Sequence, residues 1–428
     1  MLRFIIKHVL RLLARWTIKK YHPRIVGITG SVGKTGTKEA VAQVLSTKFK
    51  VGQTPKNLNN EIGLPLAILR EHDSGYSNLF LWLGIISRAI KNLIITRESF
   101  PEVLVLEYGV DHKGDIDYLV KIARPEIAIV TAVSPTHLEF LGTVEDVARE
   151  KGKLVKALPP SGVAILSADD ARVLNMENLT RARVITYGLS DKADINGANI
   201  TLNWANDTWP RGIIFKLNIQ GKSLPIFIPS VVGNPPVTVT LAAVACAIAM
   251  DISILNINDV LQKMPLPPGR LRLISGIKNS LLIDDTYNSS PRSAGEALQA
   301  LSLIEPKNFG KRFAVLGDML ELGKQSEKLH REIGSQVANL PIDYLVAVGA
   351  QARHFIHGAV EGGFSQDHTF HFDKSEQAGK FIQDKMGEGD VILIKGSQGV
   401  RCEKITKELM AEPARAKELL VRQYSPWI

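Results

Sequence analysis

Residues 25–37 read IVGITGSVGKTGT, a run of β-forming residues that leads through a glycine-rich turn into a helical stretch beginning near Lys38. Glycines let backbone N–H groups approach a phosphate closely, and the N-terminus of the following helix adds its dipole. Lys34 would reach the β- and γ-phosphates of a nucleotide, and the Thr35 hydroxyl would bind Mg²⁺. The string matches the short pattern GxxGKT, because Ile28 stands where the longer phosphate-loop pattern has its first glycine. We therefore predict a nucleotide-binding loop rather than a plain strand-to-helix turn, formed by Gly30, Ser31, Gly33, Lys34, Thr35 and Gly36.

Strand-forming runs alternate with helical stretches along most of the remaining chain. This alternation predicts an α/β fold built on parallel sheets. Residues 195–229 instead hold three short runs close together, which predict a small antiparallel excursion. The expected strands of the parallel sheets include residues 25–29, 103–107, 127–131, 163–166, 281–284, 312–316, 344–348 and 391–394.

A stretch rich in proline and glycine, MPLPPG at residues 264–269, predicts a linker between two domains. We expect a basic amphipathic helix over residues 1–23 and a central P-loop ATPase-like domain over residues 24–268. A C-terminal Rossmann-like α/β domain would follow over residues 269–428. The 428 residues are enough for two such domains with buried cores.

The positive charge is concentrated at the N-terminus. The chain has a formal net charge of +9, and residues 1–24 hold seven basic and no acidic side chains. The basic isoelectric point therefore reflects this segment rather than a nucleic-acid-binding domain, and we expect no nucleic-acid partner. Cys246 and Cys402 are the two cysteines, and neither lies in a CxxC pair. This usage fits a reducing compartment and argues against a structural zinc site, so we expect a cytoplasmic protein.

Two segments combine apolar and basic residues. In residues 1–20, basic side chains recur every four positions and apolar ones fill the other side, which is typical of a helix lying on an anionic membrane surface. The alternative is a helix packed on the protein's own body. Residues 79–95, LFLWLGIISRAIKNLII, could form an interfacial helix, a hydrophobic lid or a core helix. We expect a peripheral position on the inner face of the plasma membrane.

Eight segments, taken in order, resemble the Mur ligase family of ATP-dependent, amide-bond-forming ligases of peptidoglycan synthesis. They span residues 24 to about 408, and the last ones resemble the branch that adds D-alanyl-D-alanine. The segments are TGSVGKT (29–35), NLNNEIGLP (57–65), VLEYG (105–109), HLE (137–139) with EKG (150–152), GRL (269–271), DDTYN (284–288) with Pro291, GDMLELG (317–323) with His330, and KGS (395–397).

The resemblance implies that ATP activates a carboxylate as an acyl phosphate, that an amine attacks it, and that ADP and phosphate leave. Glu107 ends an expected strand, where a carboxylate points into the cleft of an α/β sheet, although it could also cap a helix or pair with a base. The resemblance makes Glu107 a Mg²⁺ ligand, His137 a ligand of a second Mg²⁺, and Lys151 the lysine that the family carbamylates. The expected metal ligands are Thr35, Glu107, His137 and Lys151.

The resemblance also assigns residues from the linker and the C-terminal domain. Arg270 would clamp phosphates when the domains close, and Asp285 would bind the ribose beside Tyr287 and Asn288. Lys395 and Ser397 are expected contacts for substrate or phosphates. Asn57 and Asn60 could contact the γ-phosphate or metal, or make turn hydrogen bonds. The expected catalytic residues are Lys34, Glu107, His137, Lys151 and Arg270.

Two departures from the family pattern bear on the substrate. The family's N-terminal domain, which grips the uridine nucleotide, has no counterpart in residues 1–23, so the acceptor could be a peptidyl nucleotide or a lipid-linked peptide. Pro235, Pro236 and Val239 stand where the family has residues near the adenine, so we expect different adenine contacts. We expect a monomer that adds D-Ala-D-Ala or a similar amine. The alternatives are a Mur-like ligase of another polymer and a non-catalytic nucleotide-binding scaffold.

Overall fold

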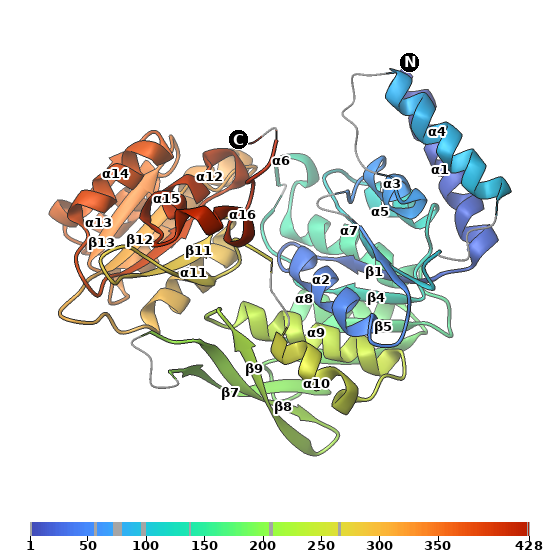
Figure 1. The fold of residues 1–428 in the computed structure, drawn as a ribbon, viewed down its shortest axis with the longest axis horizontal. Coiled ribbons are helices and arrows are strands. Elements are labelled where there is room, and N and C mark those ends of the chain that lie inside the picture. Colours follow the sequence, from blue (N-terminus) through green and yellow to red (C-terminus); the bar gives the residue numbers. More distant parts are fainter. Residues whose placement is uncertain are drawn as a thin grey trace.

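The computed structural model describes residues 2–54, 58–71, 79–95, 100–136, 138–204, 209–263, 267–425 and 427. Within these residues the strands form a nine-stranded sheet in the order β2-β3-β1-β4-β5-β6-β7-β8-β9 and a six-stranded sheet in the order β10-β11-β15-β12-β13-β14. Figure 1 shows the two sheets side by side, each with its own helices. We call the part built on the nine-stranded sheet the central domain and the part built on the six-stranded sheet the C-terminal domain.

The bounds of the elements agree with the expected alternation. The first sheet contains β1 (Arg24–Thr29), β2 (Val51–Gln53), β3 (Val103–Glu107), β4 (Ile127–Val130), β5 (Val163–Ser167), β6 (Arg183–Gly188), β7 (Ile195–Asn203), β8 (Gly212–Ile219) and β9 (Lys222–Pro229). The second contains β10 (Arg272–Ser275), β11 (Leu281–Asp285), β12 (Arg312–Gly317), β13 (Tyr344–Val348), β14 (Thr369–Phe372) and β15 (Val391–Lys395).

The helices alternate with these strands. In the central domain they are α1 (Leu2–Tyr21), α2 (Lys34–Leu45), α3 (Gly63–Leu69), α4 (Leu79–Ile94), α5 (Asp115–Val120), α6 (Leu138–Leu141), α7 (Val144–Lys156), α8 (Ala171–Leu174), α9 (Pro235–Ala249) and α10 (Ile254–Lys263). In the C-terminal domain they are α11 (Pro291–Ser302), α12 (Ser326–Ala338), α13 (Arg353–Glu361), α14 (Ser375–Lys385), α15 (Glu403–Leu409) and α16 (Ala416–Leu419).

The strands at the centre of the first sheet are parallel and buried. β1 pairs with β3 on one side and with β4 on the other, so that Ile28 lies opposite Glu107 and Thr29 opposite Val130. Every residue of β3 and β4 is buried, since helices cover both faces of the sheet. The carboxyl ends of β1, β3 and β4 therefore meet at one edge of the sheet, which is where an open α/β sheet binds its ligands.

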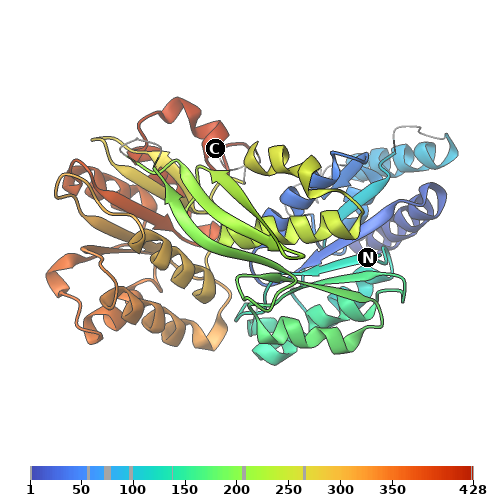
Figure 2. The ribbon, with the colours of Figure 1, turned by 90° about the horizontal axis from the view of Figure 1, so that it is seen from below.

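The antiparallel excursion expected over residues 195–229 is present and continues the same sheet. β6 pairs with β7 in parallel, whereas β7, β8 and β9 pair antiparallel. In Figure 2, which is seen from below, these long strands cross the front of the molecule toward the C-terminal domain. Phe215, Leu217 and Ile226 point inward and are buried, because alternate residues of a strand face the same side.

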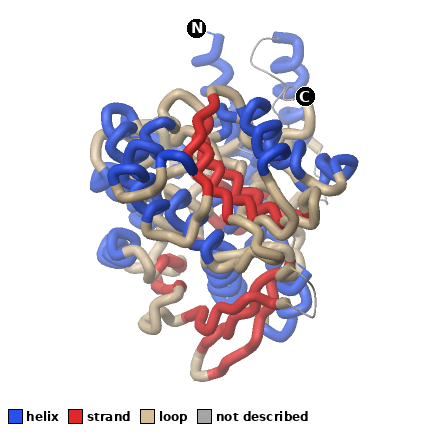
Figure 3. Tube along the Cα trace, turned by 90° about the vertical axis from the view of Figure 1, so that its left-hand side faces the viewer, coloured by secondary structure: helices blue, strands red, loops and turns tan. Residues whose placement is uncertain are grey.

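The second sheet is parallel except for its edge strand β10, which pairs antiparallel with β11. Figure 3 shows its helices on either side of the strands, which is the arrangement of a doubly wound sheet. β15 lies between β11 and β12 and places Lys395 opposite Asp285. Two candidate site residues thus meet at the carboxyl edge of this sheet.

The helix expected over residues 1–20 and the segment 79–95 form one substructure. α1 packs against α3 and α4 through a core that includes Leu10, Leu13, Leu66 and Trp82. α4 is therefore not buried on all sides. One face of each helix packs on the protein's own body, and the other face is exposed.

Candidate active site

The phosphate loop joins β1 to α2, and α2 begins earlier than its sequence indicates, at Lys34 rather than near Lys38. Gly33 precedes the helix with φ 83°, a left-handed conformation that frees the N–H groups of the first turn. At Gly30, with φ 150°, an added Cβ would lie 1.9 Å from Thr131 Oγ1. The backbone at Gly30 therefore has no room for a side chain, and the loop forms a cradle of backbone groups in front of the N-terminus of α2. Such a cradle suits a phosphate.

Lys34 folds back over this cradle. Its Nζ donates to the carbonyl oxygen of Gly30 at 2.8 Å and to that of Ser31 at 3.4 Å. Burial lowers the pKa of Lys34, and the negative charge of Glu107 opposes that effect. A cation that is incompletely solvated in this way binds an incoming anion strongly, because little water has to be displaced.

Glu107 lies at the carboxyl end of β3 and is 2% exposed. Its Oε2 accepts a hydrogen bond from Thr35 Oγ1 at 3.2 Å, and its Oε1 accepts one from Asn59 Nδ2 at 3.0 Å. The Nζ of buried Lys38 lies 4.0 Å from Oε2. The carboxylate is thus held in one orientation at the end of the phosphate loop.

Lys151, on α7, reaches the same cradle from the other side. Its Nζ donates to the carbonyl oxygen of Gly30 at 3.0 Å, and its side chain is buried. Burial, together with the neighbouring charge of Lys34, holds the pKa of Lys151 well below its usual value. Lys153 instead pairs with the buried carboxylate of Glu150 and with Asp117. Of the two lysines, Lys151 is the one at the phosphate loop.

The side chains beside the phosphate loop include oxygen ligands that suit Mg²⁺. Mg²⁺ prefers oxygen ligands and is usually held by one or two carboxylates together with phosphates. The hydroxyl of Thr35 and the carboxylate of Glu107 offer such oxygens beside the cradle. Among the described residues, no three His, Cys, Asp or Glu side chains gather into a further metal cluster. The residues present fit one Mg²⁺ beside the phosphate loop. His137 lies outside the described residues.

A pocket of about 260 Å³ lies on one side of the phosphate loop and is bordered by both domains. Arg270 leans over the ring of Tyr287, with 4.0 Å between its guanidinium carbon and the ring centroid. Lys395 Nζ lies 2.5 Å from Asp285 Oδ2 and donates to the carbonyl oxygen of Asn288 at 3.0 Å. The lining residues include Val32, Gly33, Thr131, Tyr187, Pro235, Pro236, Val239, Arg270, Asp285, Arg292, Ser293 and Lys395.

A larger cleft of about 530 Å³ lies on the other side of the loop. Residues of both domains line it, including Lys34, Thr35, Asn59, Glu107, Asp111, Tyr287, Asn288, Ser397 and Trp427. Ser397 Oγ accepts from the backbone N–H of Leu320 at 3.0 Å, which fixes the hydroxyl at the wall of the cleft. Arg270 also borders this cleft, so it stands between the two spaces.

The C-terminal segment closes part of this cleft. Arg422 is buried, pairs with Glu403 at 2.8 Å, and donates to the carbonyl oxygens of Thr286 and Tyr287. Arg401 donates to the carbonyl oxygen of Trp427 at 2.9 Å. The segment therefore holds the loop after β11 in place, and Trp427 lines the cleft.

The structure brings most of the sequence-predicted residues together around the phosphate loop. Asn60 is used locally, because its Oδ1 accepts from the N–H groups of Ile62 and Gly63 at the start of α3. Asn57 lies outside the described residues. Sequence reasoning missed Asn59, which donates a hydrogen bond to Glu107. The feature that could have pointed to it is its position between Asn57 and Asn60, two predicted site residues.

Comparison with known proteins is consistent with this geometry. The chain matches the Mur ligase middle domain over residues 28–85 and 89–247, and the Mur ligase glutamate ligase domain over residues 269–398. It is 30% identical over 404 residues to the UDP-N-acetylmuramoyl-tripeptide–D-alanyl-D-alanine ligase of Bacillus subtilis, which covers 94% of this chain and 79% of that protein.

Two solved structures share the fold. MurF from Acinetobacter baumannii superposes with a TM-score of 0.77 at 27% identity, covering 94% of this chain and 79% of that one. MurF from Thermotoga maritima, solved in complex with ADP, gives a TM-score of 0.76 at 26% identity, covering 94% and 83%.

Proposed function

Since the chain belongs to the Mur ligase family and is an ATP-dependent ligase, we propose that it joins D-alanyl-D-alanine to the peptide of a cell-wall precursor. The observation that carries this proposal is the phosphate loop itself. Lys34, Glu107 and Lys151 converge on it, and the first two line a cleft that both domains border. That placement supports transfer of a phosphoryl group to a carboxylate and attack by an amine in one enclosed space.

In this proposal the residues of the central domain hold the phosphates. Lys34 and the free N–H groups at the start of α2 bind the β- and γ-phosphates, and Thr35 and Glu107 hold Mg²⁺ with oxygen ligands. Bound Mg²⁺ would neutralise charge on the transferring phosphoryl group. Asn59 keeps the carboxylate of Glu107 turned toward the loop. His137 completes the proposed metal ligands.

The C-terminal domain holds the nucleoside and the substrates. Asp285, fixed by Lys395 and by the N–H of Leu271 at 3.3 Å, accepts a hydrogen bond from the ribose. Arg270 neutralises charge between the two spaces, and Tyr287 supports it. Asn288 and Ser397 face the larger cleft, where we place the acceptor peptide and the amine.

We further propose that Lys151 is carbamylated and serves as an oxygen ligand for a second Mg²⁺. Its lowered pKa favours the neutral amine, which attacks the carbon of CO₂ and releases a proton to leave a carbamate. The product is an anion beside Lys34, whose charge would stabilise it. Mass spectrometry of the intact protein in bicarbonate, with Lys151→Arg as control, should show a labile addition of CO₂ in the parent alone.

The test of the ligase is phosphate release from ATP with Mg²⁺, with the product identified by mass spectrometry. We expect release that requires both D-Ala-D-Ala and a UDP-muramoyl-tripeptide or a lipid-linked tripeptide. Lys34→Ala should abolish it. Release with only a lipid-linked acceptor would assign the carrier. Tight ATP binding without release for any pair would contradict the proposed reaction.

A second proposal concerns where the enzyme works: we propose that α1 and the segment around α4 rest on the inner face of the plasma membrane. In the described residues, nine of the fifteen exposed large hydrophobic side chains belong to these two segments. Trp16 is 56% and Phe80 82% exposed. No helix in the described ranges combines the length and apolar character needed to cross a membrane. An exposed apolar face on a paired helix supports lying on a surface.

Positive charge flanks this apolar face. An open groove of about 450 Å³ at the base of α1 is lined by Arg15, Lys19, His22, Lys121 and Arg124, among others. Such a groove favours an anionic lipid surface, since clustered basic residues are attracted to acidic headgroups. Lys7 and Arg11, which the sequence placed in the same stripe, instead lie over the ring of Tyr118.

Vesicle co-sedimentation tests this placement. The parent should bind phosphatidylglycerol vesicles and not phosphatidylcholine vesicles, and the double variant Trp16→Ser, Phe80→Ser should stay in the supernatant. Phe309→Ser is the matched control, because Phe309 is fully exposed on the C-terminal domain. Equal sedimentation of parent and double variant would contradict the proposal. We also propose a monomer, since one chain supplies both walls of the cleft; light scattering would check its mass.

A further inference from the structure

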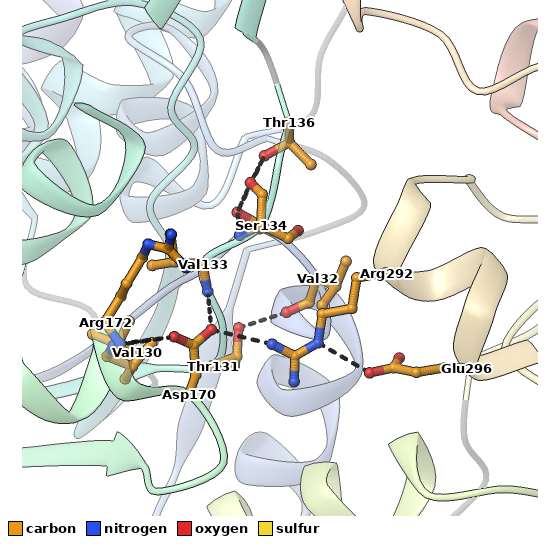
Figure 4. Close-up of polar contacts among 12 residues, drawn as sticks. Val32, Val130, Thr131, Val133, Ser134, Thr136, Asp170, Arg172, Arg292 and Glu296 are labelled. Atoms are coloured by element: carbon orange, nitrogen blue, oxygen red, sulfur yellow. Dashed lines mark hydrogen bonds and ion pairs between the residues drawn. The ribbon is translucent and has the colours of Figure 1, made fainter. Parts of the chain in front are cut away.

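Arg292 connects the two domains beside the smaller pocket. It is the second residue of α11 in the C-terminal domain, and its Nη1 lies 3.1 Å from Asp170 Oδ2 in the central domain. Its Nε donates to Glu296 one turn further along the helix at 3.0 Å. Figure 4 shows the guanidinium between these two carboxylates. The Arg292 side chain is 32% exposed and that of Asp170 only 6%.

The carboxylate of Asp170 is rigidly placed. It precedes α8 and caps it, since Oδ1 accepts from the backbone N–H groups of Arg172 at 3.0 Å and Val173 at 3.4 Å. Oδ2 accepts from the backbone N–H of Val133 at 2.8 Å. A carboxylate with this many donors holds its position, so Arg292 must come to it.

Val133 belongs to the segment that braces the phosphate loop. In this segment Thr131 Oγ1 donates to the carbonyl oxygen of Val32 at 2.5 Å, and the N–H of Ser134 donates to Ser31 Oγ at 3.0 Å. Thr136 Oγ1 also donates to Ser31 Oγ, at 3.1 Å. Figure 4 draws the contact between Thr131 and Val32 and shows Ser134 and Thr136 in the same view. Polar contacts therefore lead from α11 through Asp170 to this segment and on to the loop that would hold the phosphates.

Arg292 and Ser293 also line the smaller pocket, together with Pro235 and Val239 of the central domain. This pocket has its present shape only while α11 lies against the central domain. We propose that the Arg292–Asp170 ion pair holds α11 against the phosphate loop and so retains the nucleotide, which makes Arg292 a positioning residue for ligation. The inference rests on the proposed function in one respect, namely that the nucleoside occupies this pocket.

The size of the effect follows from how the pair acts. If the pocket binds nucleotide only when closed, the apparent Kd equals the intrinsic Kd divided by the closed fraction. Removing Arg292 leaves the buried carboxylate of Asp170 without its cation, which costs more than breaking a fully exposed pair. Losing it should therefore weaken ADP binding by about tenfold, which is about 1.4 kcal/mol.

The experiment compares Arg292→Gln with Arg331→Gln. Arg331 is a matched control, because its side chain is 35% exposed and also contacts two carboxylates, Glu327 and Glu361, but both lie within the C-terminal domain. ADP affinity is measured by calorimetry and ADP release by stopped flow. The ATP dependence of phosphate release gives KM and kcat separately.

We expect Arg292→Gln to raise the Kd for ADP and the KM for ATP about tenfold, to speed ADP release, and to change kcat by less than threefold. Arg331→Gln should leave all four within twofold of the parent. Equal values for the two variants would overturn the inference, as would loss of kcat with an unchanged Kd for ADP. A parent chain that binds no ADP would refute the proposed function instead.

Arg292→Lys separates charge from packing. Lysine keeps the positive charge but offers no planar fork for two carboxylates. Recovery of the Kd for ADP to within about threefold of the parent would support an ion pair. A Kd as weak as that of Arg292→Gln would overturn it. Thermal unfolding of each variant without nucleotide should match the parent, and a large drop confined to Arg292→Gln would assign Arg292 to folding rather than positioning.

Discussion

Asp284 allows a test of whether a buried carboxyl group in the C-terminal domain keeps its proton near neutral pH. Its side chain is completely buried at the end of β11, and Oδ1 accepts from the hydroxyls of Thr286 and Thr406. Oδ2 has no hydrogen-bond partner among the described residues. Burial raises the pKa of Asp284 to about 7, and the carboxylates of Asp285 and Glu403 add to that effect. We predict that replacing Asp284 with asparagine alters how stability depends on pH.

The sign follows from proton linkage. In the unfolded chain Asp284 ionises above pH 3.8, whereas in the folded protein it keeps its proton up to about pH 7. Between these values each pH unit costs the parent about 1.4 kcal/mol, and the total above pH 7 reaches about 4 kcal/mol. Asparagine does not titrate. The stability of Asp284→Asn relative to the parent should therefore rise by about 3 kcal/mol between pH 5 and pH 8.

Urea unfolding at fixed ionic strength, at pH 5 and pH 8, measures this difference. Hydrogen exchange of the β11 and β15 amides reports on the same sheet independently of the central domain. Any constant penalty from the new amide cancels in the comparison of the two pH values. A stability difference between variant and parent that stays the same within about 1 kcal/mol would refute the assignment of a buried, protonated carboxyl.

Three further outcomes test the site. Gly30→Ala should weaken ADP binding at least about 100-fold in calorimetry, because its Cβ would meet Thr131 Oγ1 at 1.9 Å; near-parent affinity would contradict the cradle. Glu107→Ala should lower phosphate release at least about 1,000-fold, whereas Asp318→Ala should keep measurable activity, since its Oδ1 serves the backbone N–H groups of Gln351 and Ala352. Burial lowers the pKa of His330 to about 4, and His330 Nε2 accepts a hydrogen bond from the Met319 amide. The free energy of protection of that amide against hydrogen exchange should therefore fall by about 1.4 kcal/mol per pH unit as the pH drops from 6.5 toward 4. A free energy of protection that does not change over this range would contradict the prediction.

The parts of the site that the sequence predicted are those with local signals. The phosphate loop is encoded by consecutive residues, and Glu107 and Lys395 end strands whose apolar runs are plain in the sequence. Even there the start of α2 was placed four residues late, because glycine and threonine hide the first helical turn. The resemblance assigned Lys151, and the structure adds that Lys151 reaches the loop from α7 whereas Lys153 pairs with Glu150.

Other features depend on residues far apart in the chain. Arg292 and Asp170 are 122 residues apart, and nothing in either local sequence marks their meeting. The exposed face of α1 needed its neighbours, because only the packing of α3 and α4 decides which apolar residues are covered. For α1, the sequence analysis treated membrane contact and packing on the protein's own body as alternatives. In the structure one face of α1 packs on the body and another face is exposed.

The position of Trp427 matters for anyone who handles this protein. Since it borders the larger cleft and Arg422 supports the loop after β11, a peptide attached next to Trp427 would lie beside the cleft. A peptide added before α1 would emerge beside the exposed Ile5. The hairpin turn between β8 and β9 offers a neutral place, because an added Cβ at Gly221 meets nothing within 4 Å. A purification handle or fluorophore inserted there would leave both the cleft and the exposed helices as they are.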